Sequence, residues 1–235
     1  MKNLLPAITL AVFAGVAAAA PSLDYQASLD GVTWSDSVTA TVNSTVKIRA
    51  FVRWSDVAAY GFANLNLKIT ASNWDAGDAT TIPNAFDKGG GSSAFRKAPF
   101  DAAGNTVRTA LSGTTRRWYQ LGVSSTSEGY LSLSQWAPTV NPTFSTDNPA
   151  LVIAFDYTLG SAANRSIEIG SLISRNQQSV PGSEFGFFSS AASNETSFRV
   201  SGFVDSAIIN VVVPSPNVLA AMSFGMCVVN RRRRQ

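Results

Sequence analysis

No histidine occurs anywhere in the 235 residues of this chain. Histidine titrates near neutral pH, and it is the usual general base and the commonest ligand of transition metals. Its absence excludes serine–histidine and cysteine–histidine catalytic dyads as well as histidine-ligated zinc. The chemistry that remains is that of paired carboxylates and of hard cations bound by oxygen atoms.

Cysteine is nearly absent as well, since Cys227 is the only one. A single cysteine cannot form a disulfide within the chain, and it cannot build a thiolate metal centre. The fold must therefore be stabilised by its hydrophobic core alone. The roughly 190 residues between the two ends of the chain are enough to form one such core.

Charged residues make up only 14% of the chain. The formal charge of +3 comes from 18 basic and 15 acidic residues, and removing the positive charges of Lys2 and Arg231–Arg234 changes it to −2. Binding of nucleic acid needs a basic face on the folded domain. The sequence therefore predicts no nucleic-acid partner.

Residues 1–20 have the features of a secretory signal peptide. Lys2 supplies a positive charge, Leu4 to Val16 is apolar, and Ala17 to Ala20 offers small residues for signal peptidase. The apolar stretch is shorter than the roughly 20 residues that span a membrane. We therefore expect export of the chain and cleavage after Ala19 or after Ala20.

The C-terminus contains three elements in a fixed order. Val213, Pro214, Ser215 and Pro216 come first, then the nearly charge-free run 217–230, and then Arg231, Arg232, Arg233 and Arg234. An apolar helix that ends in arginines lies in a membrane with its cations on the cytoplasmic side. We expect residues 217–230 to form a helix that anchors the precursor transiently in the membrane and makes few contacts with the rest of the protein.

Residues 213–235 resemble the PEP-CTERM sorting signal, which combines a Pro-x-Pro motif, a short hydrophobic helix and an arginine-rich end. Ser215 stands where that signal most often has glutamate, and Val-Pro-x-Pro variants of this kind are familiar in planctomycete-type bacteria. The resemblance implies processing by a membrane-embedded, exosortase-like protease. It also implies a location in the cell envelope or outside the cell, and association with exopolysaccharide.

Between these ends, residues 21–212 show the pattern of one β domain. Apolar and polar residues alternate with a period of two in short segments, and no amphipathic helix interrupts them. This pattern predicts an all-β fold, an antiparallel β-sandwich of the jelly-roll or immunoglobulin-like kind. The expected strands are 23–30, 38–42, 45–54, 62–71, 106–110, 118–123, 130–136, 150–159, 166–170, 185–189 and 198–213, the last being one strand or two strands kinked near Gly202.

The same alternation predicts which side chains face inward. The expected core residues are Val46, Ile48, Val52, Leu65, Leu67, Ile69, Val152, Phe155, Ile167 and Ile169. Val152 and Phe155 cannot share one face of a regular strand, so we expect a β-bulge or two-sided burial there.

Two consecutive segments resemble the opening strands of cohesin-type jelly rolls. They are the Thr-Val-x-Ile-x-Ala-x-Val pattern that starts at Thr45 and the Gly-Phe-x-x-Leu-x-Leu-x-Ile pattern that starts at Gly61. The segment Leu151 to Tyr157 stands where those domains have another core strand. The resemblance covers residues 45–72 and 150–170 and rests on β patterning, and residues 73–106 have no counterpart in it.

Residues 73–106 break the strand pattern and are rich in glycine, aspartate and asparagine. Long structured loops are often where function lies. Oxygen ligands from such a loop suit calcium, and the candidates are Asp75, Asp78 and Asp87, or Asp101 with Asn105. No other cofactor is expected.

Glycoside hydrolysis would need two carboxylates in one cleft. Asp75, Asp78, Glu128 and Glu184 are the candidates, but no motif ties any two of them together, so we expect solvated acids and no enzyme.

Aromatic side chains would bind sugars if several rings lay on one exposed face, although aromatic residues more often belong to cores. Trp74, Trp118 and Tyr119 flank loops and are the candidates for glycan contact.

The sequence thus predicts an exported cell-surface or extracellular-matrix protein with a structural or adhesive role. The first alternative is a non-catalytic carbohydrate-binding module, which an exposed group of aromatic residues would favour. A glycan-active enzyme is the second, and two carboxylates that converge in a cleft would favour it.

Overall fold

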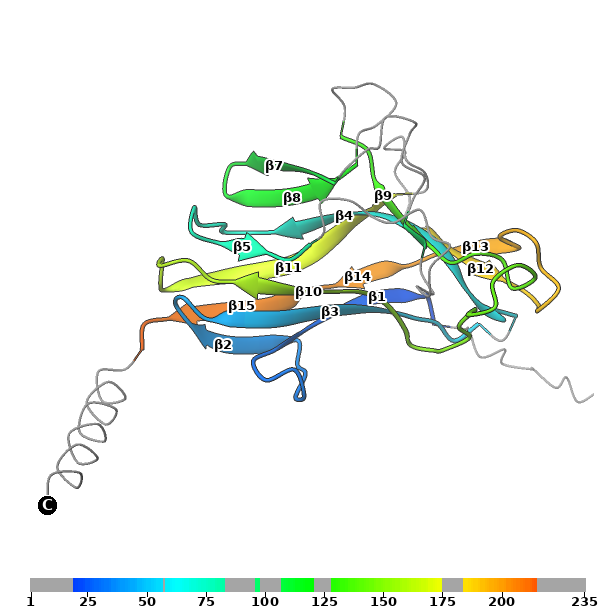
Figure 1. Ribbon diagram of the computed structural model, residues 1–235, viewed down its shortest axis with the longest axis horizontal. Coiled ribbons are helices and arrows are strands. Elements are labelled where there is room, and N and C mark those ends of the chain that lie inside the picture. The colour runs from blue at the N-terminus through cyan, green and yellow to red at the C-terminus, as the bar shows by residue number, and fades with distance from the viewer. Residues whose placement is uncertain are drawn as a thin grey trace, which may run out of the picture.

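The computed structural model describes residues 19–56, 58–82, 96–97, 107–120, 128–174 and 184–214. Within these ranges the regular elements are strands, and they form two sheets that pack face to face (Figure 1). The predicted all-β sandwich is therefore confirmed. None of the described residues belongs to a helix long and apolar enough to cross a membrane. The helices predicted for the two ends of the chain lie outside the described residues.

The smaller sheet has five strands. Their spatial order is β14 (Phe203–Asp205), β1 (Ser22–Ser28), β3 (Thr45–Arg53), β10 (Ala150–Thr158) and β5 (Ala79–Thr80).

The larger sheet has ten strands and is built around β4 (Gly61–Ala71). On one side of β4 lie β11 (Arg165–Ser174), β15 (Ala207–Val212) and β2 (Ser37–Thr41), together with β12 (Glu184–Phe188) and β13 (Phe198–Ser201). On the other side lie β8 (Thr115–Tyr119) with β7 (Arg108–Ser112), and β9 (Leu131–Ser134) with β6 (Arg96–Lys97). The chain passes repeatedly from one sheet to the other, as in a jelly roll.

Residues 198–213, expected as one strand or as two strands kinked near Gly202, form three strands. After β13 the chain leaves the ten-stranded sheet at Gly202, runs as β14 beside β1, and returns as β15. A Cβ atom at Gly202 would collide with the carbonyl oxygen of Pro21 and with the ring of Phe185, so only glycine fits at this crossing.

Two strand pairs depart from the expected antiparallel arrangement. β14 runs parallel to β1, and β15 runs parallel to β2. Strands from the beginning of the chain therefore pair with strands from the end of the domain in both sheets.

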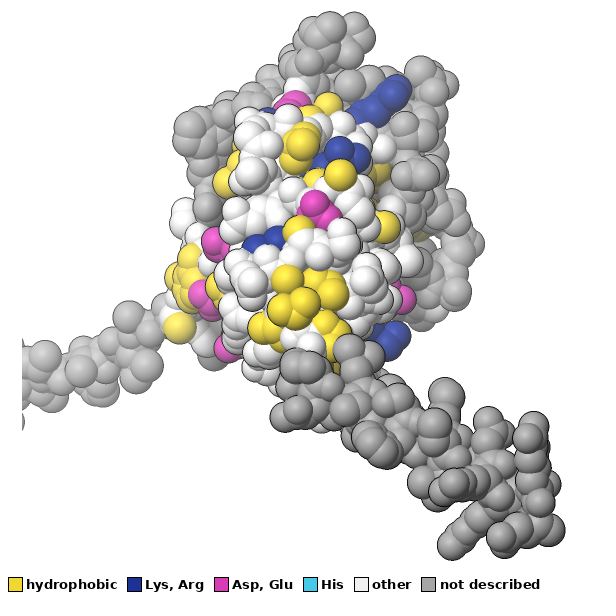
Figure 2. Space-filling view, turned by 90° about the vertical axis from the view of Figure 1, so that its left-hand side faces the viewer, with side chains coloured by type: hydrophobic (Ala, Val, Ile, Leu, Met, Phe, Trp, Pro, Cys, Tyr) yellow, Lys and Arg dark blue, Asp and Glu magenta, His cyan; other side chains and the backbone are white. Residues whose placement is uncertain are grey.

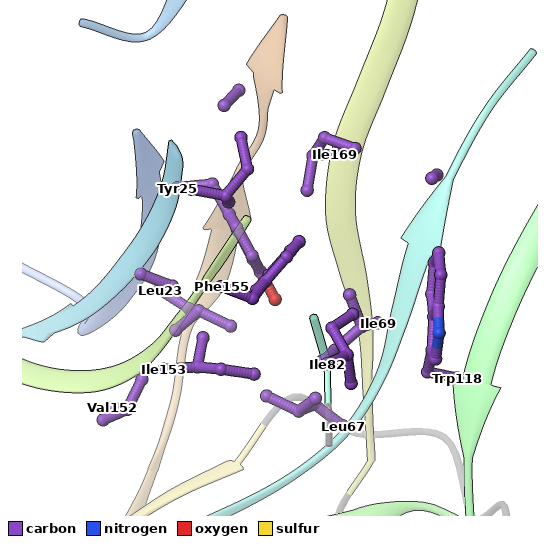
Figure 3. Packing of buried hydrophobic residues seen from close by; sticks show 14 of the residues in the cluster. Leu23, Tyr25, Leu67, Ile69, Ile82, Trp118, Val152, Ile153, Phe155 and Ile169 are labelled. Carbon is purple, nitrogen blue, oxygen red and sulfur yellow. The ribbon is translucent and has the colours of Figure 1, made fainter. Parts of the chain in front are cut away.

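The core lies between the two sheets. All ten residues predicted to face inward are buried, with at most 6% of any side chain exposed. Figure 3 shows how Leu67 and Ile69 of the ten-stranded sheet lie opposite Ile153 and Phe155 of β10. The register between β10 and β3 shifts between Leu151 and Ile153. This is the predicted bulge, and it places Val152 and Phe155 in one core.

The core extends from Leu23 to Val211. A segment with a complete hydrophobic core of its own is able to fold as an independent domain. All the described core residues lie within residues 21–212, so we expect this segment to fold without either end of the chain.

Several charged side chains on the outer face of the five-stranded sheet have partners. Lys47 lies 3.6 Å from Asp156, and Arg53 forms an ion pair with Asp24. Arg49 donates two hydrogen bonds to Gln26, and its guanidinium lies 4.1 Å from the ring centroid of Trp34. At one end of the sandwich, Figure 2 shows charged side chains scattered among uncharged polar ones.

Candidate functional site

Asp78 lies at the start of β5, at the centre of a buried hydrogen-bond network. Arg165, the first residue of β11, donates to both carboxylate oxygens at 2.7 and 2.5 Å. The Tyr157 hydroxyl donates at 2.7 Å, and the backbone amides of Asp75 and Gly160 donate at 2.9 and 2.7 Å. A carboxylate has about four lone pairs, so these donors occupy it fully.

The ionisation states of the side chains in this network do not change near neutral pH. Burial by itself raises the pKa of the Asp78 carboxyl, but the hydrogen bonds from Arg165 and from the two backbone amides outweigh it and hold the pKa below its ordinary value. Burial and the hydrogen bond to Asp78 raise the pKa of the Tyr157 hydroxyl. The carboxylate therefore stays ionised and the phenol stays neutral, which is the behaviour of a structural ion pair.

This arrangement leaves Asp78 without a free oxygen lone pair for the calcium ion that was predicted. The lone pairs of Asp78 are used within the protein, and Asp75 accepts only a long hydrogen bond of 3.4 Å from the amide of Gly77. No group of three or more carboxylate, histidine or cysteine side chains in the described ranges is arranged to hold a metal ion. The other proposed ligands, Asp87, Asp101 and Asn105, lie outside the described residues.

Among the acids considered for glycoside hydrolysis, Asp75 and Asp78 share one turn, whereas Glu128 belongs to a separate cluster. Glu128 accepts hydrogen bonds from Lys68 at 3.3 Å and from Arg117 at 3.1 Å. Lys68 is only 8% exposed, and its ammonium group lies 4.7 Å from the ring centroid of Tyr130. Asp78 and Glu128 thus each neutralise cations of their own, and Glu184 begins β12.

The three aromatic residues predicted to contact glycans have different environments. Trp74 packs edge-on against Trp118 and Tyr157, with ring centroids 5.5 and 5.6 Å apart. Trp118 is 4% exposed, so its ring belongs to the core and has no free face for a sugar. Tyr119 is partly buried at the end of β8. The structure therefore brings the rings of Trp74 and Trp118 into contact, but this contact belongs to the packing of the core.

An open cleft lies at another place, on the outer side of the ten-stranded sheet. It has a volume of about 440 Å³ and is bordered by the turn that follows β9 and by the loop between β12 and β13. Trp136 is its most exposed aromatic residue, with 36% of the side chain accessible. Asn64, Asn194, Glu195 and Thr196 also line the cleft, and we define these five residues as the Trp136 cleft.

Sequence reasoning did not find the Trp136 cleft. Trp136 was one of five tryptophans, and nothing in its own neighbourhood distinguished it. Its polar partners come from β4 and from residues 194–196, which are far away in the sequence. Only the pairing of β4 with both β9 and β12 brings these segments together.

No protein-family model and no curated protein matches this chain. Several solved structures that are similar to this chain are cohesin modules.

The sixth cohesin of Acetivibrio cellulolyticus scaffoldin B, solved with a dockerin, gives a TM-score of 0.44 at 10% identity and covers 82% of this chain and 99% of its own. A type I cohesin–dockerin complex from Clostridium thermocellum gives 0.45 at 6% identity, with coverages of 82% and 99%. A cohesin module of a Clostridium perfringens family 33 glycoside hydrolase gives 0.41 at 7% identity, with coverages of 82% and 98%. These scores lie below the level at which a shared function would follow.

Proposed function

We propose that this chain is an exported, non-catalytic β-sandwich that serves as a structural or adhesive component of the cell envelope or extracellular matrix. A C-terminal sorting signal at residues 213–235 directs its processing by a membrane-embedded, exosortase-like protease. Signal peptidase removes the signal peptide at the other end by cleaving after Ala19 or after Ala20.

The observation that carries this proposal is the place where the sandwich ends. Strand β15 finishes at Val212, and the Val-Pro-Ser-Pro motif starts at the next residue. Val213 is 59% exposed, so the motif begins outside the core and is accessible to a protease. The fold and the proposed signal therefore occupy adjoining segments that do not overlap.

The polar chemistry of the domain also supports a role without catalysis. Asp78 and Glu128, two of the acids considered for hydrolysis, hold arginine and lysine side chains in place. These contacts stabilise a sandwich that needs no disulfide, since Cys227 lies outside residues 21–212.

The test is made in the organism that produces the protein. Replacing Arg231, Arg232, Arg233 and Arg234 together by glutamine removes the positive end of the signal. We expect the unprocessed precursor to accumulate in the membrane fraction, as detected by immunoblotting with an antibody against residues 21–212.

Two variants serve as controls. Replacing the four arginines by lysine keeps the charge, and Ser215→Glu introduces the residue that this kind of signal most often has. Both are expected to be processed. Normal processing of the glutamine variant would refute the sorting-signal proposal.

A further inference from the structure

The polar residues of the Trp136 cleft are held in fixed positions. The Asn64 side-chain amide donates to the Thr196 hydroxyl at 2.6 Å, and its carbonyl oxygen accepts from Arg199 at 3.0 Å. Asn64 pairs across the sheet with Gly186, where a Cβ would lie 2.7 Å from the Asn64 oxygen. The glycine therefore leaves room for Asn64 to extend across β12 toward Thr196.

The two borders of the cleft are linked to each other. The Thr139 hydroxyl, in the turn after β9, donates to the side-chain oxygen of Asn194 at 2.9 Å. Gln135 is only 4% exposed and donates to the carbonyl oxygens of Phe62 and Ser145 at 2.5 and 2.9 Å. These bonds fix the turn against the sheet, so the cleft exists before a ligand arrives and little ordering is needed on binding.

The lining combines an aromatic ring with neutral hydrogen-bonding groups. Trp136 and Val140 are exposed at 36% and 63%, while Asn64, Asn194 and Thr196 offer amides and a hydroxyl. Among the described residues that line the cleft, Glu195 is the one charged residue and none is a lysine or an arginine. The described lining therefore offers neutral amides, a hydroxyl and one carboxylate, and the guanidinium of Arg199 beside it is bonded to Asn64.

The ligand that fits these groups has an apolar face for the indole and many neutral hydroxyls for the amides. Ligand sites typically use such a surface, with an aromatic wall and a few fixed polar groups that set orientation. We propose that the Trp136 cleft binds a neutral saccharide, with a sugar ring stacked on Trp136 and its hydroxyls bonded by Asn64, Asn194, Glu195 and Thr196. This goes beyond the proposed function, because it concerns a ligand and not the route of export.

The test uses residues 21–212, which contain the complete core, labelled with 5-fluorotryptophan. Fluorine spectra are recorded during titration with cellohexaose, xylohexaose, mannohexaose and laminarihexaose, and with an alginate hexamer as an anionic comparison. The resonance of Trp136, assigned from Trp136→Phe, is expected to shift with at least one neutral oligosaccharide and to stay unchanged with alginate. The resonance of Trp34, on the outer face of the other sheet, should not move.

Calorimetry with the neutral oligosaccharide that binds then compares two alanine variants. Trp136→Ala should weaken binding at least tenfold, whereas Trp34→Ala should leave it unchanged. Circular dichroism checks that both variants are folded, and the spectra of the unsubstituted protein test the proposal even if one variant is not. Absence of a Trp136 shift with every neutral oligosaccharide, or equal losses in the two variants, would overturn it. Export and processing in cells are measured separately, so this proposal and the sorting proposal can fail independently.

Discussion

At the scale of residues, the ion pair of Asp78 and Arg165 connects the two sheets. Asp78 precedes β5 of the five-stranded sheet, and Arg165 begins β11 of the ten-stranded sheet. The Asp78 side chain is fully buried and that of Arg165 is 11% exposed. Charges removed from water to this extent are tolerated only when all their hydrogen-bonding groups have partners, and the donors from Tyr157 and Gly160 provide them.

The first prediction follows because the buried charge of Arg165 needs its partner Asp78. Asp78→Asn leaves Arg165 buried without a counter-charge, which should lower the free energy of unfolding by about 3–5 kcal/mol at neutral pH. Urea denaturation monitored by circular dichroism measures it. The matched control is Asp156→Asn, which breaks the exposed pair with Lys47 and should cost less than about 1 kcal/mol. Similar losses in the two variants would show that the Asp78 network is not a special contribution to stability.

The lowered pKa of Asp78 also fixes the sign of a pH effect. Its ionised form stabilises the fold fully above the unfolded-state pKa, near 3.8, and this contribution is lost as the pH falls through the lower folded-state pKa. The unsubstituted domain should therefore lose more stability on acidification below about pH 4 than Asp78→Asn does. Parallel pH profiles for the two proteins would contradict this.

Asp205 leads to the opposite prediction. Asp205 is an exposed residue of β14, but partial desolvation, and then the neighbouring carboxylate of Asp24, raise its pKa. A raised acid pKa means that the folded state binds the proton more tightly, so stability falls as the pH rises from the unfolded-state pKa through the folded-state value. Asp205→Asn should therefore be more stable than the unsubstituted domain at pH 7, and the difference should disappear by pH 3. Urea denaturation over this range tests it, and equal stability at pH 7 would refute it.

At the scale of elements, β4 determines the stability of the sandwich because it is the strand around which the ten-stranded sheet is built. It pairs with β11 and β12 on one edge and with β8 and β9 on the other. Leu65, Leu67 and Ile69 point from it into the core and are completely buried.

Leu67→Ala should therefore lower the free energy of unfolding by about 2–5 kcal/mol, since it removes buried methyl groups and leaves a cavity. Leu172→Ala is the matched control, because Leu172 lies on the adjacent strand β11 and is 50% exposed. Chemical denaturation of both variants measures the difference. A loss below roughly 0.5 kcal/mol for Leu67→Ala would be incompatible with a fully buried side chain.

The elements also show what a sequence can predict. Alternation along Thr45–Arg53 and Gly61–Ala71 predicts their buried faces, because a period of two is a local property of the chain. The bulge in β10 was predicted because Val152 and Phe155 conflict with that period. A kink near Gly202 was predicted, but the crossing between the sheets at that point and the Trp136 cleft were not. Both depend on contacts with distant segments, namely Pro21 for the crossing and residues 194–196 for the cleft.

At the scale of the whole molecule, the sandwich is closed by its first and last strands. β1 and β2, from the beginning of the domain, pair in parallel with β14 and β15 from its end. β15 also lies between β11 and β2, and it contributes Ala207, Ile209 and Val211 to the core. A chain without β15 would leave β2 without its neighbour in the ten-stranded sheet and would expose one side of the core.

This arrangement predicts sharply different effects of two truncations. With both proteins in the same mild detergent, residues 21–212 should unfold cooperatively at the same temperature as residues 21–235. The reason is that residues 213–235 follow the last core strand. A chain that ends at Ser206 lacks β15 and should not fold cooperatively, since it loses three buried side chains and the strand pairing with both β11 and β2. Calorimetric melting of the three proteins tests this.

A lower melting temperature for residues 21–212 than for 21–235 would mean that the tail packs on the sandwich, and it would count against a separate sorting signal. A cooperative transition in the chain that ends at Ser206 would show that the sandwich does not depend on closure by its last strand.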